Sequence, residues 1–358
     1  MTWAAELRGI LPLRPAGLLT RPADLLAARR LVGSLRTDGS AHGSARGLQR
    51  TFSDLLVFRL DGDTGPPVMV KHPRSPRATA SLTQECAAVL LLQRDERLGA
   101  WRRLLPSVER CRLDGPQPLV VERLLPGAAG DTLLRGSPRL AHRMATTALG
   151  AISELHAATG RRQDVTPRLG DWVDTPLAVL AEGVPRCRDG RESEAAELLR
   201  DRLITTLTGR TLSVGWTHGD FHPGNVLLTP DGGEPLGVVD WAGAVPDGPC
   251  ALDCHTFVLT LRHQLEGRQL GRIVADVVRR ACLVPEDRRL LAEAATPAAD
   301  PAEETALTLL TWLWHVAGNV AKSTRYGRSR RWVADNVVPV LDEVAAREFR
   351  DARHVRRP

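Results

Sequence analysis

Lysine is nearly absent from this chain. Of its 48 basic residues only Lys71 and Lys322 are lysine, and the other 46 are arginine. Such a skew, together with abundant alanine, glycine and proline, is typical of a GC-rich coding bias. A lysine that persists in this background, as Lys71 does within PVMVKHP, indicates a position that requires a compact ammonium group.

Long hydrophobic runs and dense cysteine clusters are missing too. Apolar stretches such as AAVLLL from Ala87 are far shorter than the roughly 20 residues that cross a bilayer. The N-terminal stretch MTWAAELRGILPLRP carries Glu6, Arg8 and early prolines and does not resemble a signal peptide. Six cysteines spread over 358 residues are no disulfide framework. We therefore expect a cytoplasmic protein without a membrane partner.

The net charge of +6 is a weak indication of nucleic-acid binding, because 42 acidic residues balance most of the arginines. Arginines cluster in RYGRSRRW from Arg325 and in the C-terminal stretch REFRDARHVRRP, without a stacking-aromatic motif. We expect solvated surfaces there and no nucleic-acid partner. Salt-dependent binding to bulk DNA would test the alternative.

The pattern of elements predicts two lobes and an α+β fold class. After a helical segment at residues 1–35, residues up to 125 contain strand-like runs (SDLLVFRL, PVMVKHP, VERCRL, PLVVERLLPG) and one helix, TQECAAVLLLQR. From about Leu133 the periodicity is mainly helical. The expected domains are a small antiparallel β-rich lobe at 1–125 and a larger helical lobe at 126–358.

The densest group of polar residues lies in WTHGDFHPGNVLLTPDGGEPLGVVDW, residues 216–241. Two short apolar strands flank the turn PDGGEP. If this turn centres on Gly232 and Gly233, antiparallel pairing places Asn225 opposite Asp240, about 4.5–5.5 Å away. An amide oxygen and a carboxylate there are suitable ligands for Mg²⁺, with phosphate oxygens as further ligands. The alternative is a polar strand end that faces water.

Asp220 precedes Asn225 by five residues. Pro223 and Gly224 oppose a regular helix between them, so Asp220 is expected on a loop. A loop also argues against a zinc site from His218 and His222, which would need both on one helical face. A loop carboxylate beside a metal pair can orient an attacking hydroxyl and accept its proton.

Lys71 is expected to form an ion pair with Glu85. The glutamate follows 14 residues later, in a helix predicted to be capped at Ser81 with Gln84 completing the capping box. It lies on an apolar stripe of that helix, where a carboxylate requires a partner. Taken alone, a surface salt bridge would explain the same pattern.

HGDFHPGN (218–225) followed by VVDW (238–241) resembles the aminoglycoside phosphotransferase and choline kinase-like family. The spacing of His, Asp, Asn and the later Asp carries the resemblance, which extends over residues 30–345. It implies a bilobal protein-kinase-like fold. It also implies ATP-dependent phosphorylation of a hydroxyl group on a small molecule, with ATP and Mg²⁺ as cofactors.

The resemblance assigns a role to each of these residues. Asp220 corresponds to the catalytic base, and Asn225 and Asp240 correspond to the Mg²⁺ ligands. Lys71 corresponds to the lysine that contacts the α- and β-phosphates, with Glu85 fixing its position.

Other correspondences to the family are looser. The stretch PLVVERL resembles the strand and hinge whose backbone contacts adenine, at Glu122 to Leu124. The loop GSAHGSARG could fold over phosphates through its backbone N–H groups and Ser40 or Ser44. It lacks the spacing of the protein-kinase glycine loop, and a flexible linker is the alternative.

Three further polar residues near the motif are expected to be structural. His218 is expected to brace the catalytic loop through backbone hydrogen bonds, and His222 to have a packing role. Asp253, in GPCALDCH, resembles a family aspartate that holds the helix which follows it.

The acceptor is the least determined part of the site. After Asp240 the chain enters a helical segment with no room for a long activation segment, which favours a small molecule over a protein. TWLWHVAGN could line the acceptor pocket or belong to the core. Candidate acids for gripping a polycation are Asp247, Glu303 and Glu304. An aminoglycoside, a sugar, an amino alcohol or a related metabolite all remain open.

A catalytically silent kinase-like protein, which binds nucleotide or acts as a scaffold, is the main alternative to an enzyme. Such a protein would normally have lost Lys71, Asp220, Asn225 or Asp240, and all four are present. The expected oligomeric state is a monomer or a homodimer.

Overall fold

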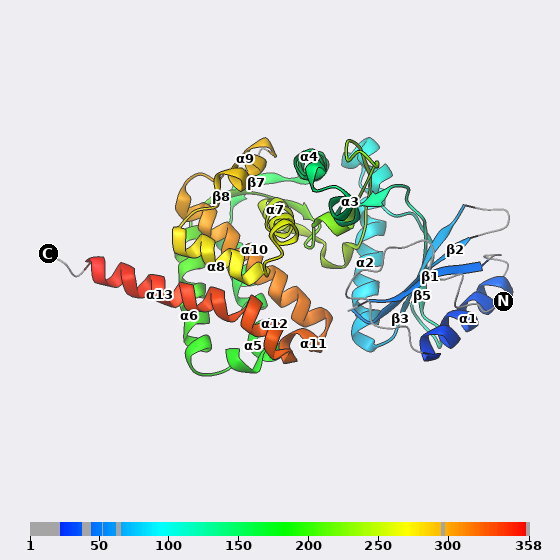
Figure 1. Ribbon diagram of the computed structural model, residues 1–358, viewed down its shortest axis with the longest axis horizontal. Helices are drawn as coiled ribbons and strands as arrows, with labels where there is room; N and C mark the ends of the chain where they lie inside the picture. Colours follow the sequence, from blue (N-terminus) through cyan, green and yellow to red (C-terminus); the bar gives the residue numbers. More distant parts are fainter. Residues whose placement is uncertain (1–21, 38–43, 52, 62–65, 295–297, 356–358) are drawn as a thin grey trace.

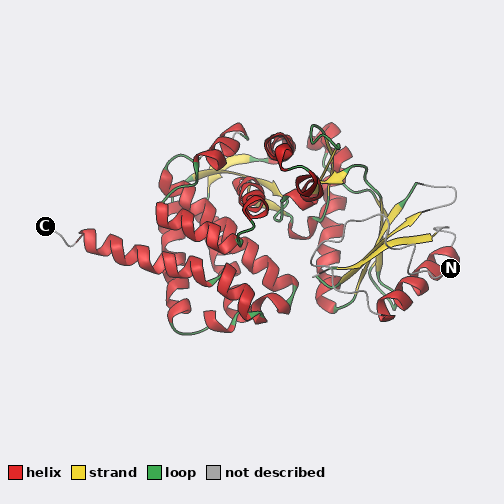
Figure 2. Cartoon of the chain, viewed as in Figure 1, coloured by secondary structure: helices red, strands yellow, loops and turns green. Residues whose placement is uncertain are grey.

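The computed structural model describes residues 22–37, 44–51, 53–61, 66–294 and 298–355. They form two lobes, one built around an antiparallel sheet and one mainly helical (Figures 1 and 2). No helix among the described residues is long and apolar enough to cross a membrane.

The first lobe contains a five-stranded sheet in the order β1-β2-β3-β5-β4, with all neighbours antiparallel. Val70 packs against α1 on one face of the sheet, so its neighbour Lys71 lies on the opposite face, toward α2. The elements are α1 (Pro22–Thr37), β1 (Ser44–Arg50), β2 (Leu55–Asp61), β3 (Val68–Pro73), α2 (Pro76–Arg94), β4 (Val108–Arg112) and β5 (Leu119–Arg123).

Of the stretch GSAHGSARG, the structure describes residues 44–47, which belong to strand β1. Ser40 lies outside the described residues, whereas Ser44 is the first residue of β1. The pairing of β1 with β2 is irregular around Gly47, whose φ of 63° is left-handed. A glycine in this conformation is characteristic of a β-bulge. The prediction of a loop as far as Gly47 was therefore wrong, because Gly47 lies within strand β1, which pairs with β2.

Helix α2 begins earlier than predicted. Its first residue is Pro76, and the Ser75 hydroxyl accepts a hydrogen bond of 3.3 Å from the Ala78 N–H. The cap is therefore Ser75 and not Ser81. Proline suits this first position because its φ is already helical and it has no N–H to satisfy. The earlier start places Glu85 at the middle of the helix, on its buried face.

The second lobe surrounds α10, which contacts α5, α6, α7 and α8. Trp312 on α10 is fully buried and donates its indole N–H to the Asn336 carbonyl at 2.7 Å, so this part of TWLWHVAGN is core. The helices are α3 (Gly130–Gly136), α4 (Ala141–Thr159), α5 (Thr175–Gly183), α6 (Arg191–Leu207), α7 (Ala251–Glu266), α8 (Leu270–Arg280), α9 (Pro285–Glu293), α10 (Pro301–Lys322), α11 (Thr324–Arg328), α12 (Arg330–Asn336) and α13 (Val338–Val355).

Two small antiparallel sheets complete this lobe, in the orders β10-β9-β6 and β11-β8-β7. Together they place the loop between β8 and β9 next to the loop that follows β10. Their strands are β6 (Ala128–Ala129), β7 (Arg161–Asp164), β8 (Thr211–Thr217), β9 (Val226–Leu228), β10 (Pro235–Val238) and β11 (Val245–Pro249).

The β9–β10 hairpin forms as expected, but its register differs from the prediction. Val238 pairs with Val226, and the Val239 N–H donates to the Asn225 carbonyl at 2.9 Å. Asn225 therefore lies opposite Val239, and the expected pairing with Asp240 was wrong by one residue. The turn centres on Asp231 and Gly232, one residue earlier than assumed, because the Thr229 N–H donates to the Glu234 carbonyl at 3.1 Å.

Candidate active site

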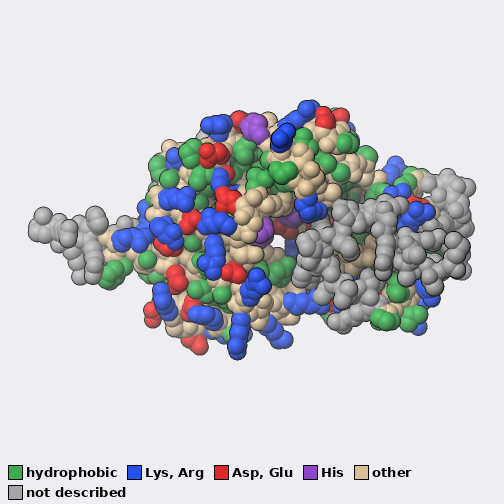
Figure 3. Space-filling view, viewed as in Figure 1, with side chains coloured by type: hydrophobic (Ala, Val, Ile, Leu, Met, Phe, Trp, Pro, Cys, Tyr) green, Lys and Arg blue, Asp and Glu red, His purple; other side chains and the backbone are tan. Residues whose placement is uncertain are grey.

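A cavity of about 900 Å³ lies between the sheet of the first lobe and the helices of the second. The molecular surface is hollowed there, with histidine at the edge of the hollow (Figure 3). Residues of β2, β3, α2 and β5 line one side, and residues of the β8–β9 loop, α7, α10 and α12 line the other. Lys71, Glu85, Asp220, Asn225 and Asp240, which the sequence singled out separately, all line this one cavity.

Lys71 is held by two carboxylates. Its Nζ lies 2.7 Å from Glu85 Oε1 and 2.8 Å from Glu122 Oε2. The expected Lys71–Glu85 ion pair is present, whereas the sequence suggested only backbone chemistry for Glu122. Burial alone would lower the pKa of Lys71, but the two carboxylates raise it above its ordinary range. Lys71 is therefore a fixed positive charge on the wall of the cavity.

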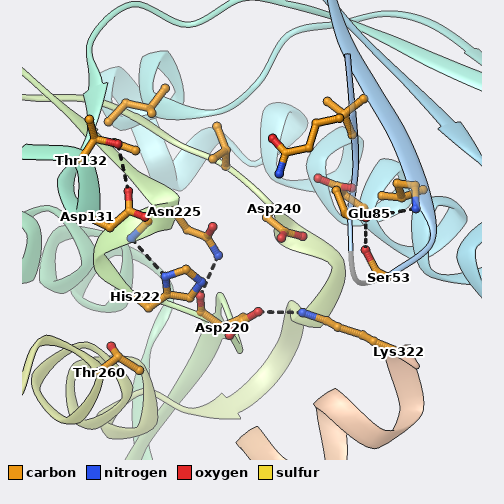
Figure 4. Close-up of a pocket in the computed structure, with 18 of the residues that line it drawn as sticks. Ser53, Glu85, Asp131, Thr132, Asp220, His222, Asn225, Asp240, Thr260 and Lys322 are labelled. Atoms are coloured by element: carbon orange, nitrogen blue, oxygen red, sulfur yellow. Dashed lines mark hydrogen bonds and ion pairs between the residues drawn. The ribbon is translucent and has the colours of Figure 1, made fainter. Parts of the chain in front are cut away.

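The backbone of the β8–β9 loop requires glycine at its second position. Gly219 has a φ of +76°, and a Cβ there would lie 2.0 Å from the Gly243 carbonyl oxygen. Both the left-handed conformation and the close approach exclude a side chain. This turn directs the next residue, Asp220, into the cavity (Figure 4).

Asp253 anchors the same loop from the first turn of α7. Its carboxylate accepts hydrogen bonds from the His218 N–H at 2.8 Å and the Gly219 N–H at 2.9 Å, and His156 Nε2 lies 3.0 Å away. From the sequence we expected Asp253 to hold its own helix in place. The structure shows that it also fixes the backbone on which Asp220 stands.

We expect Asp253→Ala to lower the free energy of unfolding by about 3 kcal/mol, since it leaves two buried backbone N–H groups and a histidine without their acceptor. Chemical denaturation would measure this loss. Asp247→Ala is the matched control, because Asp247 is half-exposed and its arginine partners lie 3.5 and 3.9 Å away; it should change stability by less than about 0.5 kcal/mol. Equal stabilities for the two variants would contradict the anchoring role.

His218 joins the two loops of the site. Its Nδ1 accepts a hydrogen bond from the Asp220 N–H at 3.3 Å, so the proton lies on Nε2, which donates to the Val239 carbonyl at 3.0 Å. Burial lowers the pKa of His218, and the imidazole is therefore neutral. This arrangement matches the expected bracing role. His222 caps the following turn by accepting a hydrogen bond from the Gly224 N–H at 3.0 Å, and its ring also lines the cavity.

Asn225 and Asp240 present the oxygens that a hard cation would need. Asn225 Nδ2 donates to the Asp220 carbonyl at 3.0 Å, which orients the amide and leaves its oxygen for another partner. Asp240 has a φ of 67°, and no residue in the described ranges donates a hydrogen bond to its carboxylate. The described residues include no cluster of three or more His, Cys, Asp or Glu suited to a metal. Two protein oxygens beside room for phosphate suit Mg²⁺.

Asp220 has a partner that sequence reasoning missed. Lys322, at the end of α10, places its Nζ 2.7 Å from Asp220 Oδ2 (Figure 4). Burial would raise the pKa of Asp220, but the ammonium group of Lys322 holds it well below its ordinary range. The rarity of lysine was the available signal, because the reasoning applied to Lys71 applies equally to Lys322.

The nucleotide side of the cavity differs in part from expectation. Glu122 and Leu124 both line the cavity, but the Leu124 N–H already donates to the Pro67 carbonyl at 3.0 Å. Ser44 is not among the lining residues; Thr51 and Ser53, near the β1–β2 turn, are. The hydroxyls near a phosphate would therefore come from this turn and not from Ser44.

The acids proposed to bind a polycation lie outside the cavity lining. Asp247 pairs with surface arginines, Glu303 faces Arg210, and Glu304 pairs with Arg288 at 2.7 Å. None of the three acids lines the cavity. On the acceptor side the described lining residues between the start of α7 and the end of α12 carry no acid: they are Thr260, His263, Gln264, Gln269, Leu270, His315, Asn319, Lys322, Tyr326, Trp332 and Asn336. Asp131 of α3 also lines the cavity, and it pairs with Arg135 at 3.2 Å.

Comparisons with known proteins agree with this architecture. Residues 44–291 match the family model described as the phosphotransferase enzyme family. No curated protein sequence matches the chain.

Several solved structures share the fold. Aminoglycoside-3'-phosphotransferase of type VIII superposes with a TM-score of 0.54 at 21% identity, covering 81% of this chain and 98% of its own. Aminoglycoside phosphotransferase APH(3'')-Id from Streptomyces rimosus gives 0.51 at 18%, covering 80% and 98%. A macrolide 2'-phosphotransferase type I gives 0.50 at 15%, covering 90% and 98%. These similarities confirm the predicted bilobal, protein-kinase-like α+β fold.

Proposed function

Because the chain belongs to the phosphotransferase enzyme family, we propose that it transfers the γ-phosphoryl group of ATP to a hydroxyl group of a small molecule. One observation carries this proposal. The Lys71–Glu85 pair from the first lobe and Asp220, Asn225 and Asp240 from the second line a single cavity. These are the charges and oxygens that phosphoryl transfer uses, since its catalysis is mainly positioning and electrostatic stabilisation.

In the proposed reaction, Lys71 binds the α- and β-phosphates from the sheet side. Asp220 accepts a hydrogen bond from the acceptor hydroxyl and takes its proton as the new bond from oxygen to the γ-phosphorus forms and the bond to the β–γ bridging oxygen breaks. Asn225 and Asp240 would hold Mg²⁺. When bound, this ion would offset negative charge on the phosphate oxygens. A structure of Streptomyces rimosus APH(3'')-Id with ADP and streptomycin supports a nucleotide in the same fold.

The charge on the acceptor side favours a neutral or singly charged acceptor over a polycation. Its described lining from α7 to α12 consists of amides, hydroxyls, aromatic rings, one leucine, two histidines and Lys322. The nearby acids Asp131 and Asp220 of the second lobe are already paired with Arg135 and Lys322. Burial lowers the pKa of His315 to about 4, so this imidazole is neutral at physiological pH. Amides and aromatic rings bind hydroxyl-rich rings through hydrogen bonds and stacking. A sugar or a glycosylated metabolite fits this lining better than a compound with several ammonium groups.

The test is a screen of ATP consumption with Mg²⁺ across monosaccharides, glycosylated compounds, nucleosides, amino alcohols and aminoglycosides. We expect the highest kcat/KM with a neutral hydroxyl compound, and at least about tenfold lower values with polycations. Mass spectrometry should show one added phosphoryl group on the acceptor. Efficient turnover of aminoglycosides alone would contradict the inference about acceptor charge.

A protein that only binds nucleotide is the remaining alternative. It would bind Mg²⁺-ATP with ordinary affinity and consume none with any acceptor. Calorimetric titration of ATP, run beside the screen, separates this outcome from a misfolded preparation, which would bind nothing.

A further inference from the structure

Both lysines of this chain line the same cavity. Lys71 enters from β3 and Lys322 from the end of α10, on the opposite side. The other 46 basic residues are arginine, and of those in the described ranges only Arg59 and Arg123 reach the cavity lining. Lysine is thus confined to one site of the molecule, which indicates that the chemistry of that site requires an ammonium group at both positions.

Lys322 belongs to a polar stripe on α10. His315, Asn319 and Lys322 follow one another at intervals of four and three residues, and all three line the cavity. His315 Nε2 and Asn319 Nδ2 are hydrogen-bonded at 3.0 Å, which fixes the base of the stripe. Lys322 is the last residue of this stripe, and only 21% of its side chain is exposed. Its ammonium group is therefore directed into the site and not into solvent.

The two ammonium groups differ in how fully their charge is matched. Lys71 has two carboxylates within 2.8 Å, Glu85 and Glu122. Of the carboxylates in the described ranges, only that of Asp220 forms an ion pair with Lys322, at 2.7 Å, and Asp240 attracts the ammonium group from further away. A phosphoryl group with more than one negative charge competes better for an ammonium that a single carboxylate holds than for one that two carboxylates hold.

The carboxylate that holds Lys322 is also the one proposed to receive the acceptor hydroxyl. While Asp220 Oδ2 accepts from the ammonium, that oxygen is occupied. An arginine at this position would bind the carboxylate through two parallel N–H donors and keep it. A lysine makes a single point contact on a flexible four-carbon side chain and can exchange partners. This difference explains why lysine is found here in a chain that otherwise uses arginine.

We infer that Lys322 binds the γ-phosphoryl group of the nucleotide, and that it exchanges its Asp220 partner for phosphoryl oxygens as it does so. This inference rests on the proposed phosphotransferase function. Lys322 would then stabilise the charge on the transferred group from the acceptor side, while Lys71 does so from the sheet side. The exchange frees the Asp220 carboxylate for the acceptor hydroxyl only when a nucleotide with a γ-phosphate is bound.

The test compares the affinities of Mg²⁺ complexes of ATP and ADP by calorimetric titration. For Lys322→Met we expect the dissociation constant of ATP to rise about tenfold or more, with a change in that of ADP below about twofold, because only ATP offers a γ-phosphate. Arg328→Met is the matched control, since Arg328 is exposed, six residues further on and outside the cavity lining. Lys71→Met should weaken both nucleotides by similar factors.

Two outcomes of this titration would overturn the inference. Equal losses for ATP and ADP in Lys322→Met, with an unchanged melting temperature, would overturn the γ-phosphate contact and leave the proposed function standing. Wild-type protein that binds neither nucleotide would overturn both.

A labelling experiment on the unaltered protein makes the test independent of how the variant folds. An amine-specific reagent can modify only Lys71, Lys322 and the terminal amine. A non-hydrolysable ATP analogue should protect Lys322, mapped by peptide mass spectrometry, at least threefold more than ADP does. Equal protection by the two nucleotides would overturn the inference.

Discussion

Asp220→Asn is expected to lower kcat for phosphoryl transfer by about 10³-fold while Mg²⁺-ATP still binds. The substitution keeps the shape of the side chain but removes the charge that accepts the hydroxyl proton. The backbone should be unaffected, because the N–H of residue 220 donates to His218 and its carbonyl accepts from Asn225. Steady-state ATP consumption with the best acceptor and calorimetric ATP binding together measure the two effects.

The binding measurement is the internal control for this prediction. The Asp220 carboxylate is paired with Lys322, and Asn225 contacts only the backbone carbonyl of Asp220, so ATP affinity should stay the same or increase when the carboxylate pairing is weakened. A variant that retains more than about a tenth of the wild-type kcat would remove Asp220 from the role of base. A variant that has lost ATP binding would instead place Asp220 in the nucleotide site.

The meeting of the site residues in one cavity could be predicted largely because three of them are close in sequence. Asp220, Asn225 and Asp240 lie within one loop and hairpin, where spacing determines which side chains emerge together. The ion pair of Lys71 and Glu85 could be predicted because a strand lysine and a buried helical glutamate each require a partner. The assignment of strands to the first lobe and helices to the second followed from the periodicity of apolar residues.

Two predictions about local structure were wrong: the register of the β9–β10 hairpin and the first residue of α2. Counting outward from Gly232 and Gly233 placed the turn one residue too late, because Pro235 pairs with Leu228; the irregularity between Pro235 and Gly237 then reduces the error in register from two residues to one. One extra residue in a strand changes every partner beyond it, and composition does not reveal where it is inserted. At α2 the stronger signal was the Ser-Pro pair at residues 75 and 76, since proline favours the first helical position.

The remaining misses concern contacts between distant parts of the chain. Lys322 and Asp220 are 102 positions apart, and their contact depends on how α10 packs in the second lobe. The suggested polycation-binding acids failed for a related reason, because arginines from other elements pair with them. In a chain with 46 arginines most acids have a partner, so an acid in the sequence is weak evidence for a binding site.

Asp240→Asn is expected to lower phosphoryl transfer by about 10³-fold and to raise the Mg²⁺ concentration needed for half-maximal activity by at least about tenfold. Removing this carboxylate removes the one formal negative charge of the proposed metal pair, and metal stabilisation of the transition state amounts to several kcal/mol. Asparagine is the right substitution because residue 240 has a φ of 67°, a left-handed conformation that Asp and Asn both tolerate.

Asp231→Asn provides the matched control in the same hairpin. Asp231 lies in the turn, away from the cavity lining, and pairs with Arg143 at 2.7 Å on the surface. Its loss should leave the Mg²⁺ requirement unchanged and cost under about 1 kcal/mol of stability. Activity would be titrated with Mg²⁺ and then with Mn²⁺, which accepts the same oxygen ligands. If Asp240→Asn and Asp231→Asn show the same metal dependence, the cation must bind through other residues, and Asp240 would need a different role in the cavity.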